Sequence, residues 1–459
     1  MSPSNPLTPA PSSQGREGST YVRYRVMAFL LVLSFITYFD RVCIVRVQQN
    51  IQKELTISDD QMGYILGAFW LAYSLFEIPG GWLGDRYGAR LTLTRVVFFW
   101  SLFTVFTGLS FGFLSLLLIR FLFGMGEAGA FPNMARVQSM WLPASARGRA
   151  GGLLWLAARW GGAFSPFLFA ALIRYIDSPA VRAVLPGLEG VAGWRIGFWV
   201  AGVVGFVWCV WFYLWFKDNP ADKKTVNAAE LALIRGDASA ADDHGHRLPL
   251  MELMRLLFRN RSLLALAGFY LFGSFGWSFF VSWMPRYLND VHHFSFDSSE
   301  SIWKQPLLYG GVSCLLGGTL SDWLVRRSGR RWLGRAVFPL GGLSVAAVSI
   351  FCVRYVNNPD DAVMLMCIAG AAFDFGQGAT WASIVDIGGS YAGSATGFIN
   401  MLGNMGNAVQ PAIGAWIFNH LGWNVLFAVY ASAFLMSASM WFWINPAQPF
   451  HRSPESESS

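Results

Sequence analysis

Charged residues are scarce in this chain. Only 13% of its 459 residues are Asp, Glu, Lys or Arg, whereas 54% are hydrophobic, and the mean hydropathy is +0.41. A water-soluble domain needs more polar surface than this to cover its core. The composition therefore excludes an ordinary soluble protein and predicts a chain that lies mostly in lipid.

Cysteine is also rare, and signatures of metal sites are missing. The five cysteines all fall within apolar stretches and lack metal-ligand spacing: Cys43, Cys209, Cys314, Cys352 and Cys367. No HExxH motif and no cluster of metal ligands occur in the sequence. We therefore expect no enzyme activity, no metal and no cofactor, and we interpret the cysteines as small buried hydrophobic residues.

Long apolar runs, in contrast, recur along almost the whole chain. Each run needs roughly 20 residues to cross the hydrocarbon of a bilayer. Backbone polar groups in lipid must be satisfied within the segment, so such spans are helices. We predict an all-α membrane protein with twelve spans, at residues 26–47, 61–83, 91–110, 114–138, 149–174, 194–216, 262–284, 304–325, 333–355, 362–386, 391–418 and 423–444.

The basic residues follow a topological pattern. If the N-terminus lies inside, the loops on that side hold most of the basic residues behind the net charge of +7. These are Arg86, Arg90, Arg147, Arg149, Lys217, Lys223, Lys224, Arg326, Arg327, Arg330, Arg331 and Arg335. The opposite loops hold chiefly Arg174, Arg182, Arg286 and Arg354. By the positive-inside rule we predict a multi-pass protein of the plasma (inner) membrane with both termini in the cytoplasm. The charge thus reflects topology in a lipid bilayer, and no nucleic-acid partner is expected.

One long polar stretch divides the predicted spans six and six. It contains NPADKKTVNAAELALIRGD, which predicts a Pro turn followed by a short charged helix. The first 20 residues are rich in Ser, Pro and Gly and predict a disordered tail. The predicted domains are a cytoplasmic tail at 1–20, a six-helix bundle at 21–217, a cytoplasmic linker with a short helix at 218–261, a second six-helix bundle at 262–445 and a cytoplasmic tail at 446–459.

The two halves share a motif. GWLGDRYGAR (81–90) follows the second span, and GTLSDWLVRRSGRR (318–331) follows the eighth, 237 residues later. In each copy an Asp ends a helix beside an Arg-rich turn, where it can cap a neighbouring helix N-terminus and pair with Arg. A helix-loop-helix with chance acids would explain one copy, but two at matching positions indicate a repeated transporter bundle. We predict that four residues of these loops hold the bundles shut on the inside and act in gating: Asp85, Arg86, Arg90 and Asp322.

This doubled motif resembles a known family. Residues 81–90 closely resemble the signature loop of the major facilitator superfamily, and residues 318–331 resemble its degenerate second-half copy with a short insertion. The similarity covers about residues 24–445. The resemblance implies twelve transmembrane helices in two pseudo-symmetric six-helix bundles, and we expect a monomer.

Five ionisable residues of the first half lie where lipid-depth helices should have none. They are Asp40, Arg41, Arg120, Glu127 and Arg159. Each costs at least ~3 kcal/mol at bilayer depth, which makes it a functional candidate. These charges could simply neutralise one another in ion pairs. Three arginines against two carboxylates nevertheless leave a positive remainder, which suits a carboxylate that Arg grips through two hydrogen bonds.

The second half has polar and aromatic stripes instead of matching basic residues. At helical spacing they are Asp374, Gln377 and Trp381; Asn400, Asn404 and Asn407; and Tyr270, Ser274 and Trp277. For Tyr270 and Trp277 packing is the favoured interpretation. The Asn stripe fits either recognition of substrate hydroxyl groups or hydrogen bonds between helices, and the sequence leaves both open.

The constellation resembles one branch of the superfamily, the anion:cation symporters. That branch includes bacterial hexuronate, galactonate and glucarate transporters and the vesicular glutamate and sialic acid carriers. The matching stretches are YFDR (38–41), RFLFGMGEAGAFP (120–132), WLPASARGRAGG (141–152) and SWMPRYL (282–288).

The resemblance assigns roles residue by residue. It implies that Arg41 and Arg120 bind the substrate carboxylate and that Asp40 and Glu127 handle protons. It also puts Tyr38, Tyr73, Trp381 and Asn400 at substrate-contacting positions, and Gln377 is added from the stripe on the tenth span.

Arg159 departs from the branch pattern, because sugar-acid members carry a polar residue near the middle of span five. Arg159 therefore either contacts the substrate or pairs with Asp374, which is itself unusual, and an extra Arg would suit a dianion. We predict a secondary active transporter that imports a sugar acid or another small carboxylate by proton symport and alternating access. The alternatives are sodium-coupled transport or exchange of another organic anion such as a dicarboxylate, and a transporter-like anion receptor.

Overall fold

The computed structural model describes residues 18–184, 186–188, 190–235, 248–293, 302 and 304–451. Apart from short 3-10 turns, the regular secondary structure of these residues is α-helical. Most of the two predicted tails lies outside the described residues, and so does the linker segment 236–247.

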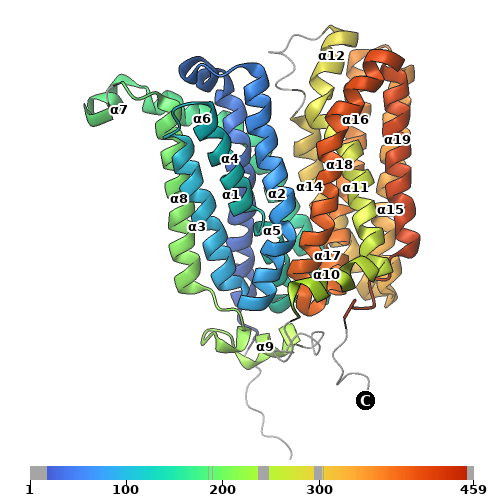
Figure 1. Cartoon of the computed structure of the whole chain (residues 1–459). Helices are drawn as coiled ribbons and strands as arrows, with labels where there is room; N and C mark the ends of the chain where they lie inside the picture. Colours follow the sequence, from blue (N-terminus) through green and yellow to red (C-terminus); the bar gives the residue numbers. More distant parts are fainter. Residues whose placement is uncertain are drawn as a thin grey trace, which may run out of the picture.

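The helices form two bundles that stand side by side in Figure 1, the first blue to green and the second yellow to red. The first bundle holds α1 (Val22–Leu55), α2 (Asp59–Tyr87), α3 (Ala89–Thr107), α4 (Phe113–Glu127), α5 (Ala130–Trp141), α6 (Arg147–Ile176), α7 (Pro179–Val184) and α8 (Gly193–Trp215). Between the bundles in the chain come α9 (Ala228–Arg235) and α10 (Leu250–Arg259). The second holds α11 (Arg261–Ser282), α12 (Met284–His292), α14 (Gln305–Ser328), α15 (Arg331–Cys352), α16 (Pro359–Phe375), α17 (Gln377–Gly388), α18 (Ala392–Leu421) and α19 (Trp423–Ser439).

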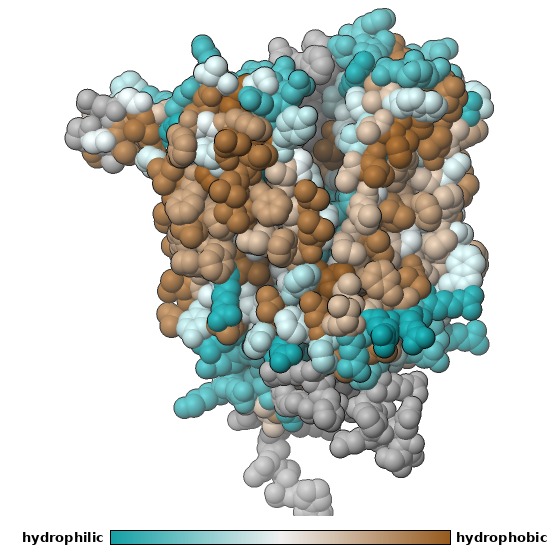
Figure 2. Space-filling view, in the orientation of Figure 1, coloured by the Kyte–Doolittle hydropathy of each residue, from teal (hydrophilic) through white to brown (hydrophobic). Residues whose placement is uncertain are grey.

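The two ends of the molecule are distinguished by their short helices. We call the end with α9 and α10 the linker side, and the end with α7 and α12 the far side (Figure 1). On the face shown in Figure 2, a hydrophobic band covers both bundles between these ends, and hydrophilic residues gather above and below it. In α8, for example, Val203, Val207 and Trp211 are more than half exposed. Such a band matches the hydrocarbon layer of a bilayer.

Nine helical stretches of the described residues are long and apolar enough to cross a membrane. One of them, Pro359–Leu421, is 63 residues long and contains two of the predicted spans, 362–386 and 391–418. The predicted spans 61–83 and 304–325 correspond to α2 and α14, which are outside this set because acidic residues and glycines lower their hydropathy. Both nevertheless run through the bundles (Figure 1). The all-α, twelve-span fold predicted from the sequence is confirmed.

Two predicted spans each contain a short irregularity near the middle, where the structure divides them into two helices. Span 114–138 divides into α4 and α5 after Glu127, and span 362–386 divides into α16 and α17 at Gly376. Glycine destabilises a helix interior. Pro132 lacks the backbone N–H that would continue the hydrogen bonds of α4, so it lies in the first turn of α5. The breaks lie at the level of the candidate site described below.

The two bundles touch closely on the linker side, because glycines let backbones approach there. A Cβ atom on Gly81 of α2 would lie 2.3 Å from the carbonyl oxygen of Gly393 on α18. A Cβ atom on Gly318 of α14 would lie 2.2 Å from the carbonyl oxygen of Gly148 on α6. The linker side is therefore closed in this structure.

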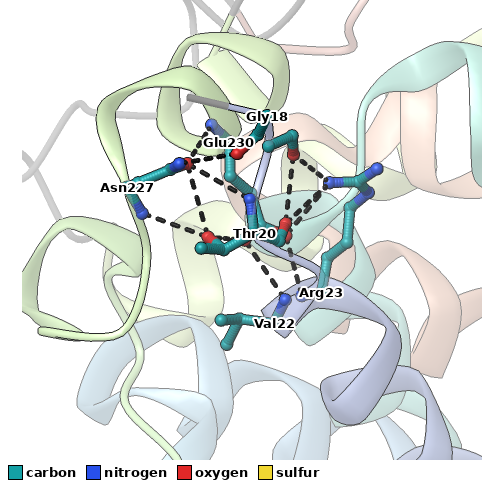
Figure 3. Close-up of polar contacts among 7 residues, drawn as sticks. Gly18, Thr20, Val22, Arg23, Asn227 and Glu230 are labelled. Carbon is teal, nitrogen blue, oxygen red and sulfur yellow. Dashed lines mark hydrogen bonds and ion pairs between the residues drawn. The ribbon is translucent and has the colours of Figure 1, made fainter. Parts of the chain in front are cut away.

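The start of α1 is fastened to the linker helix α9 by one buried carboxylate (Figure 3). Glu230 is fully buried and accepts hydrogen bonds from Thr20 Oγ1 at 2.5 Å, from the N–H groups of Val22 and Arg23 at 3.1 and 3.0 Å, and from Arg23 Nη1 at 3.0 Å. An acid at a helix N-terminus is favourable, and here its oxygens are well satisfied. The contact holds α9 to the first bundle.

Candidate functional site

A cavity of about 550 Å³ lies between the two bundles. Some of its lining side chains on the far side are half exposed, with Val45 57% and Val281 53% exposed. Toward the linker side the bundles close at the glycine contacts described above. The cavity therefore opens toward the far side, where Figure 2 shows a groove between the two halves.

Seven of the eight predicted substrate-binding residues line this cavity, although they come from distant parts of the chain. They are Tyr38, Arg41, Tyr73, Arg120, Arg159, Gln377 and Asn400.

Trp381 is the exception. It is fully buried, and its indole N–H donates to Gln138 Oε1 at 2.9 Å on α5. Gln377 lines the cavity and Trp381 lies one helical turn further toward the linker side, where α17 already packs on the first bundle. The ring contacts Phe131 and Trp155, two lining residues, from behind. Trp381 thus supports the cavity wall and is not part of its surface in this structure.

Arg41 forms an ion pair across the first bundle. Its Nη2 and Nε atoms lie 2.5 and 3.2 Å from Glu127 Oε1, and Glu127 is fully buried at the end of α4. Tyr38, Trp70 and Tyr73 surround the Arg41 guanidinium with their ring centroids about 5 Å away. The aromatic rings exclude water and stabilise the cation through its contacts with their faces.

Arg120 is the cation without a partner. It is 2% exposed, and its guanidinium forms no ion pair or hydrogen bond with any residue that the structure describes. The group lies over the rings of Phe123 and Phe69, with centroids at 4.5 and 5.2 Å. Because Arg120 lines the cavity, a ligand that binds there would lie beside this unpaired cation.

Asp40 faces away from the cavity. It is 2% exposed and accepts a hydrogen bond from the indole N–H of Trp100 on α3 at 2.9 Å. Its other oxygen has no partner among the described residues. The sequence admitted an ion pair between Asp40 and an arginine. Asp40 forms no such pair with the described residues, because its side chain faces Trp100 on α3.

Arg159 makes the ion pair that the sequence left as one of two alternatives. Its Nε and Nη2 atoms donate to Asp374 Oδ2 and Oδ1 at 2.9 and 2.7 Å, so the pair is bidentate and joins α6 of one bundle to α16 of the other. Both side chains are buried. The Trp277 ring lies 4.1 Å from the guanidinium, so this aromatic residue contacts a cation as well as packing.

Glu77 on α2 is a further buried charge, which was not predicted from the sequence. This carboxyl is fully buried in the middle of the apolar stretch LFEIPGG, and Asn404 Nδ2 of α18 donates to its Oε2 at 2.9 Å. The signal that identified the other buried charges, an ionisable residue inside a predicted span, applies equally to Glu77.

On the linker side the two acids of the repeated motif cap helices of the opposite bundle. Asp85 accepts hydrogen bonds from the backbone N–H groups of Gly393 and Ser394 at 3.1 and 2.7 Å, at the start of α18. Asp322 accepts from the N–H groups of Gly148 and Arg149 at 3.0 and 2.7 Å, at the start of α6. The placement of both acids is the one that the motif predicts, and their role in gating stays a prediction.

The two arginines predicted beside Asp85 lie elsewhere. Arg86 stacks on Trp82 and Tyr87 of its own helix. Arg90 donates to the carbonyl oxygen of Tyr213 at 2.6 and 2.9 Å, within the first bundle. Neither side chain has a hydrogen bond or an ion pair with the opposite bundle among the residues that the structure describes. The arginine that approaches Asp85 is Arg136 of α5, whose Nε lies 3.7 Å away.

Comparison with known proteins gives the family. The profile of the Major Facilitator Superfamily matches residues 30–411. The "Probable sulfoacetate transporter SauU" of Cupriavidus necator is 30% identical over 92% of this chain and 94% of that protein. The "Probable galactarate/D-glucarate transporter GarP" of Escherichia coli is 31% identical, with 88% and 90% covered, and the "Hexuronate transporter" of Bacillus subtilis is 30% identical, with 90% and 91% covered.

Solved structures agree on the fold. The proton:xylose symporter XylE superposes with a TM-score of 0.69 at 16% identity, over 95% of this chain and 98% of that chain. The human organic anion transporter MFSD10 superposes with a TM-score of 0.68 at 13% identity, over 92% and 100%. This chain belongs to the major facilitator superfamily. It is a multi-pass membrane transporter and not an enzyme.

Proposed function

We propose that this protein imports a small organic anion, such as a sugar acid or another carboxylate, by proton symport and alternating access. The relatives named above carry sulfoacetate, galactarate or glucarate, and hexuronate according to their names. Their similarity over about nine-tenths of this chain supports an anionic substrate of that size.

The observation that carries the proposal is the unpaired guanidinium of Arg120 in the wall of the cavity. A buried cation without a counter-charge costs several kcal/mol, because low dielectric penalises an isolated charge. A substrate carboxylate would remove that penalty and form two parallel hydrogen bonds with the fork of Arg120. The opposite wall offers amides from Gln377, Asn400 and Asn404, which suit the hydroxyl groups of a sugar acid.

Proton coupling follows from the pair between Arg41 and Glu127. Protonation of Glu127 would release Arg41, and the site would then hold two free cations for the anion. Loss of the proton restores the ion pair and expels the substrate. Asp40 is the second proton-coupling candidate, because its buried carboxyl has a single donor, Trp100.

The conformation supports alternating access. The linker side is closed by the caps of Asp85 and Asp322, while the cavity opens to the far side. The basic loops lie on the linker side, which by the positive-inside rule is the cytoplasmic face of the plasma membrane. The structure then corresponds to an outward-facing state, and both termini lie in the cytoplasm.

Reconstituted transport tests the proposal. Purified protein in proteoliposomes should accumulate a radiolabelled sugar acid, selected first by thermal shift from sugar acids and dicarboxylates, when the outside is made acidic. A sodium gradient without a pH gradient should drive no uptake. Uptake that needs a sodium gradient would show sodium-coupled transport. Exchange of anions that depends on neither gradient would show an exchanger. A protein that binds the anion but moves none of it under any gradient would be a receptor.

A further inference from the structure

Glu77 stands out among the buried carboxyl groups of the molecule because its surroundings compensate a negative charge only weakly, through one amide donor and no ion pair among the described residues. It is fully buried, its Oε2 receives one hydrogen bond from Asn404, and its Oε1 has no partner among the described residues. No Lys, Arg or His side chain lies within 4.0 Å of it in the part of the chain that the structure describes. A buried carboxylate with so little compensation takes the neutral, protonated form.

Other buried acids of this protein show what compensation looks like. Asp374 has a bidentate arginine. Glu230 receives four hydrogen bonds, two of them from backbone N–H groups, as Figure 3 shows. Glu127 is paired with Arg41. Glu77 has none of these arrangements, although it is buried as completely as Glu230.

The position of Glu77 matters as much as its isolation, because the carboxyl is sealed by the opposite bundle. Its hydrogen-bond partner, Asn404, belongs to α18. A Cβ atom on Gly397 of α18 would lie 2.4 Å from the backbone carbonyl oxygen of Glu77, so the two helix backbones touch at this residue. Separation of the bundles on the linker side would remove this cover and admit water to the carboxyl. Asp40, in contrast, is sealed by Trp100 of its own bundle, and that separation leaves its cover in place.

The other polar groups around Glu77 do not supply a fixed counter-charge. On α18 the nearest side chains are the neutral amides of Asn400 and Asn404. From the other elements, the groups that act on Glu77 are the Arg41 guanidinium on α1 and the Tyr73 hydroxyl on α2 itself. Arg41, the cation that acts on Glu77 most strongly, is itself paired with Glu127.

We propose that Glu77 is a proton-binding residue that links protonation to closure of the linker side. Its neutral form can be covered by α18 at little cost, whereas its ionised form favours the state in which the bundles have separated there and water reaches it. Protonation therefore favours the closed linker side seen here, and deprotonation favours its opening. This inference rests on the proposed function, because in transport Glu77 would bind protons together with Asp40 and Glu127. The experiment that tests it needs no substrate.

Spin-label distances across the linker side test the proposal. Labels are placed at Tyr87→Cys of α2 and Arg327→Cys of α14, two exposed positions, with Cys352→Ser to remove the one partly exposed native thiol. The protein is studied without substrate in lipid nanodiscs between pH 5 and pH 9. With Glu77 present, the ratio of open to closed populations should rise at least ~10-fold over this range.

Three variants separate a titrating role from a structural one. Glu77→Gln keeps the shape and stays neutral, so the closed population should change less than ~3-fold across the same range. Glu77→Asp keeps an acid and should retain the pH dependence. Asn404→Leu removes the donor that favours the carboxylate, so the midpoint of opening should move to higher pH.

The inference is overturned if Glu77→Gln opens with the same pH dependence as its parent, or if the parent shows no pH dependence. It is equally overturned if Asp40→Asn abolishes the response and Glu77→Gln does not. A failure of the proposed function would give a different result. The linker side would still close in a pH-dependent way, but a pH gradient would drive no anion uptake.

Discussion

The two walls of the cavity differ in chemistry although they come from halves that share one fold. Both halves supply aromatic rings, but the first half supplies the cations Arg41 and Arg120, whereas the second supplies amides such as Asn400. The buried pair between Arg159 and Asp374 joins the two walls. A repeated fold can thus keep its helix packing while one copy specialises in charge and the other in hydrogen bonding. In this view the first wall recognises that the substrate is an anion, and the second wall distinguishes one anion from another.

Breaking the ion pair between Arg159 and Asp374, which joins the two walls, should have the largest effect, and the effect is on the stability of the protein. Arg159→Met leaves Asp374 buried without a counter-charge, which should lower the free energy of unfolding by about 3–5 kcal/mol. Asp374→Asn should cost a similar amount, because it leaves the arginine alone. Unfolding in detergent, followed by tryptophan fluorescence, measures both. The double variant Arg159→Met/Asp374→Leu removes both charges and should recover most of the loss, and a double variant as unstable as the sum of the singles would refute the pairing.

Changes in the cationic wall should have the next largest effect, and this effect is on the affinity for the substrate. Arg120→Ala removes the unpaired guanidinium and should weaken binding of a carboxylate substrate about 100-fold, or about 2.7 kcal/mol. Arg120→Lys should recover little of this, because Lys cannot present a planar fork. Isothermal titration calorimetry gives the dissociation constants. Arg286→Ala, which alters an exposed arginine near the mouth of the far side, is the matched control and should bind normally. Unchanged affinity in Arg120→Ala would remove the anion site from this wall.

The neutral wall should respond more weakly and more selectively. Asn400→Ala removes hydrogen bonds worth about 0.5–1.5 kcal/mol each, so a hydroxylated acid should bind roughly 3- to 10-fold less tightly. A carboxylic acid of the same chain length without hydroxyl groups should bind this variant and the parent equally well. Equal losses for the two ligands would mean that Asn400 holds the helices together and does not select the substrate.

The helix caps below both walls should affect binding least. Asp85→Asn and Asp322→Asn weaken the contacts that close the linker side but touch no ligand. Equilibrium affinity should therefore stay within ~3-fold of the parent while transport slows, because the caps change populations and not contacts. Initial uptake rates and titration calorimetry on the same preparations make the comparison. Parental transport rates in both variants would argue against a gating role.

Much of this architecture was predictable from composition and pattern. Apolar runs located the spans because lipid demands continuous helices. The doubled motif predicted the caps of Asp85 and Asp322, since an acid beside a close helix contact finds free N–H groups nearby. The cavity residues were identified because ionisable side chains are costly in lipid and therefore easily recognised.

Three-dimensional pairing was the part that the sequence left open. Whether Arg159 meets Asp374 depends on how α6 faces α16, and spacing along one helix carries no information about the neighbouring helix. Trp381 lies behind the cavity wall for the same reason, because the depth at which α17 packs against the first bundle decides its exposure. The partner of Asp40, an indole N–H on α3, is likewise a contact between helices.

The central claim is that Glu127 carries the coupling proton beside a cationic anion site. Glu127→Gln imitates a permanently protonated carrier, so it should bind substrate and sustain counterflow, which requires only movement of the loaded form. Accumulation driven by a pH gradient should vanish, because the variant cannot release a proton inside and return empty. The decisive measurement compares pH-driven uptake with counterflow in proteoliposomes of Glu127→Gln and its parent. Counterflow without pH-driven accumulation is the predicted result, and undiminished pH-driven accumulation would contradict the account.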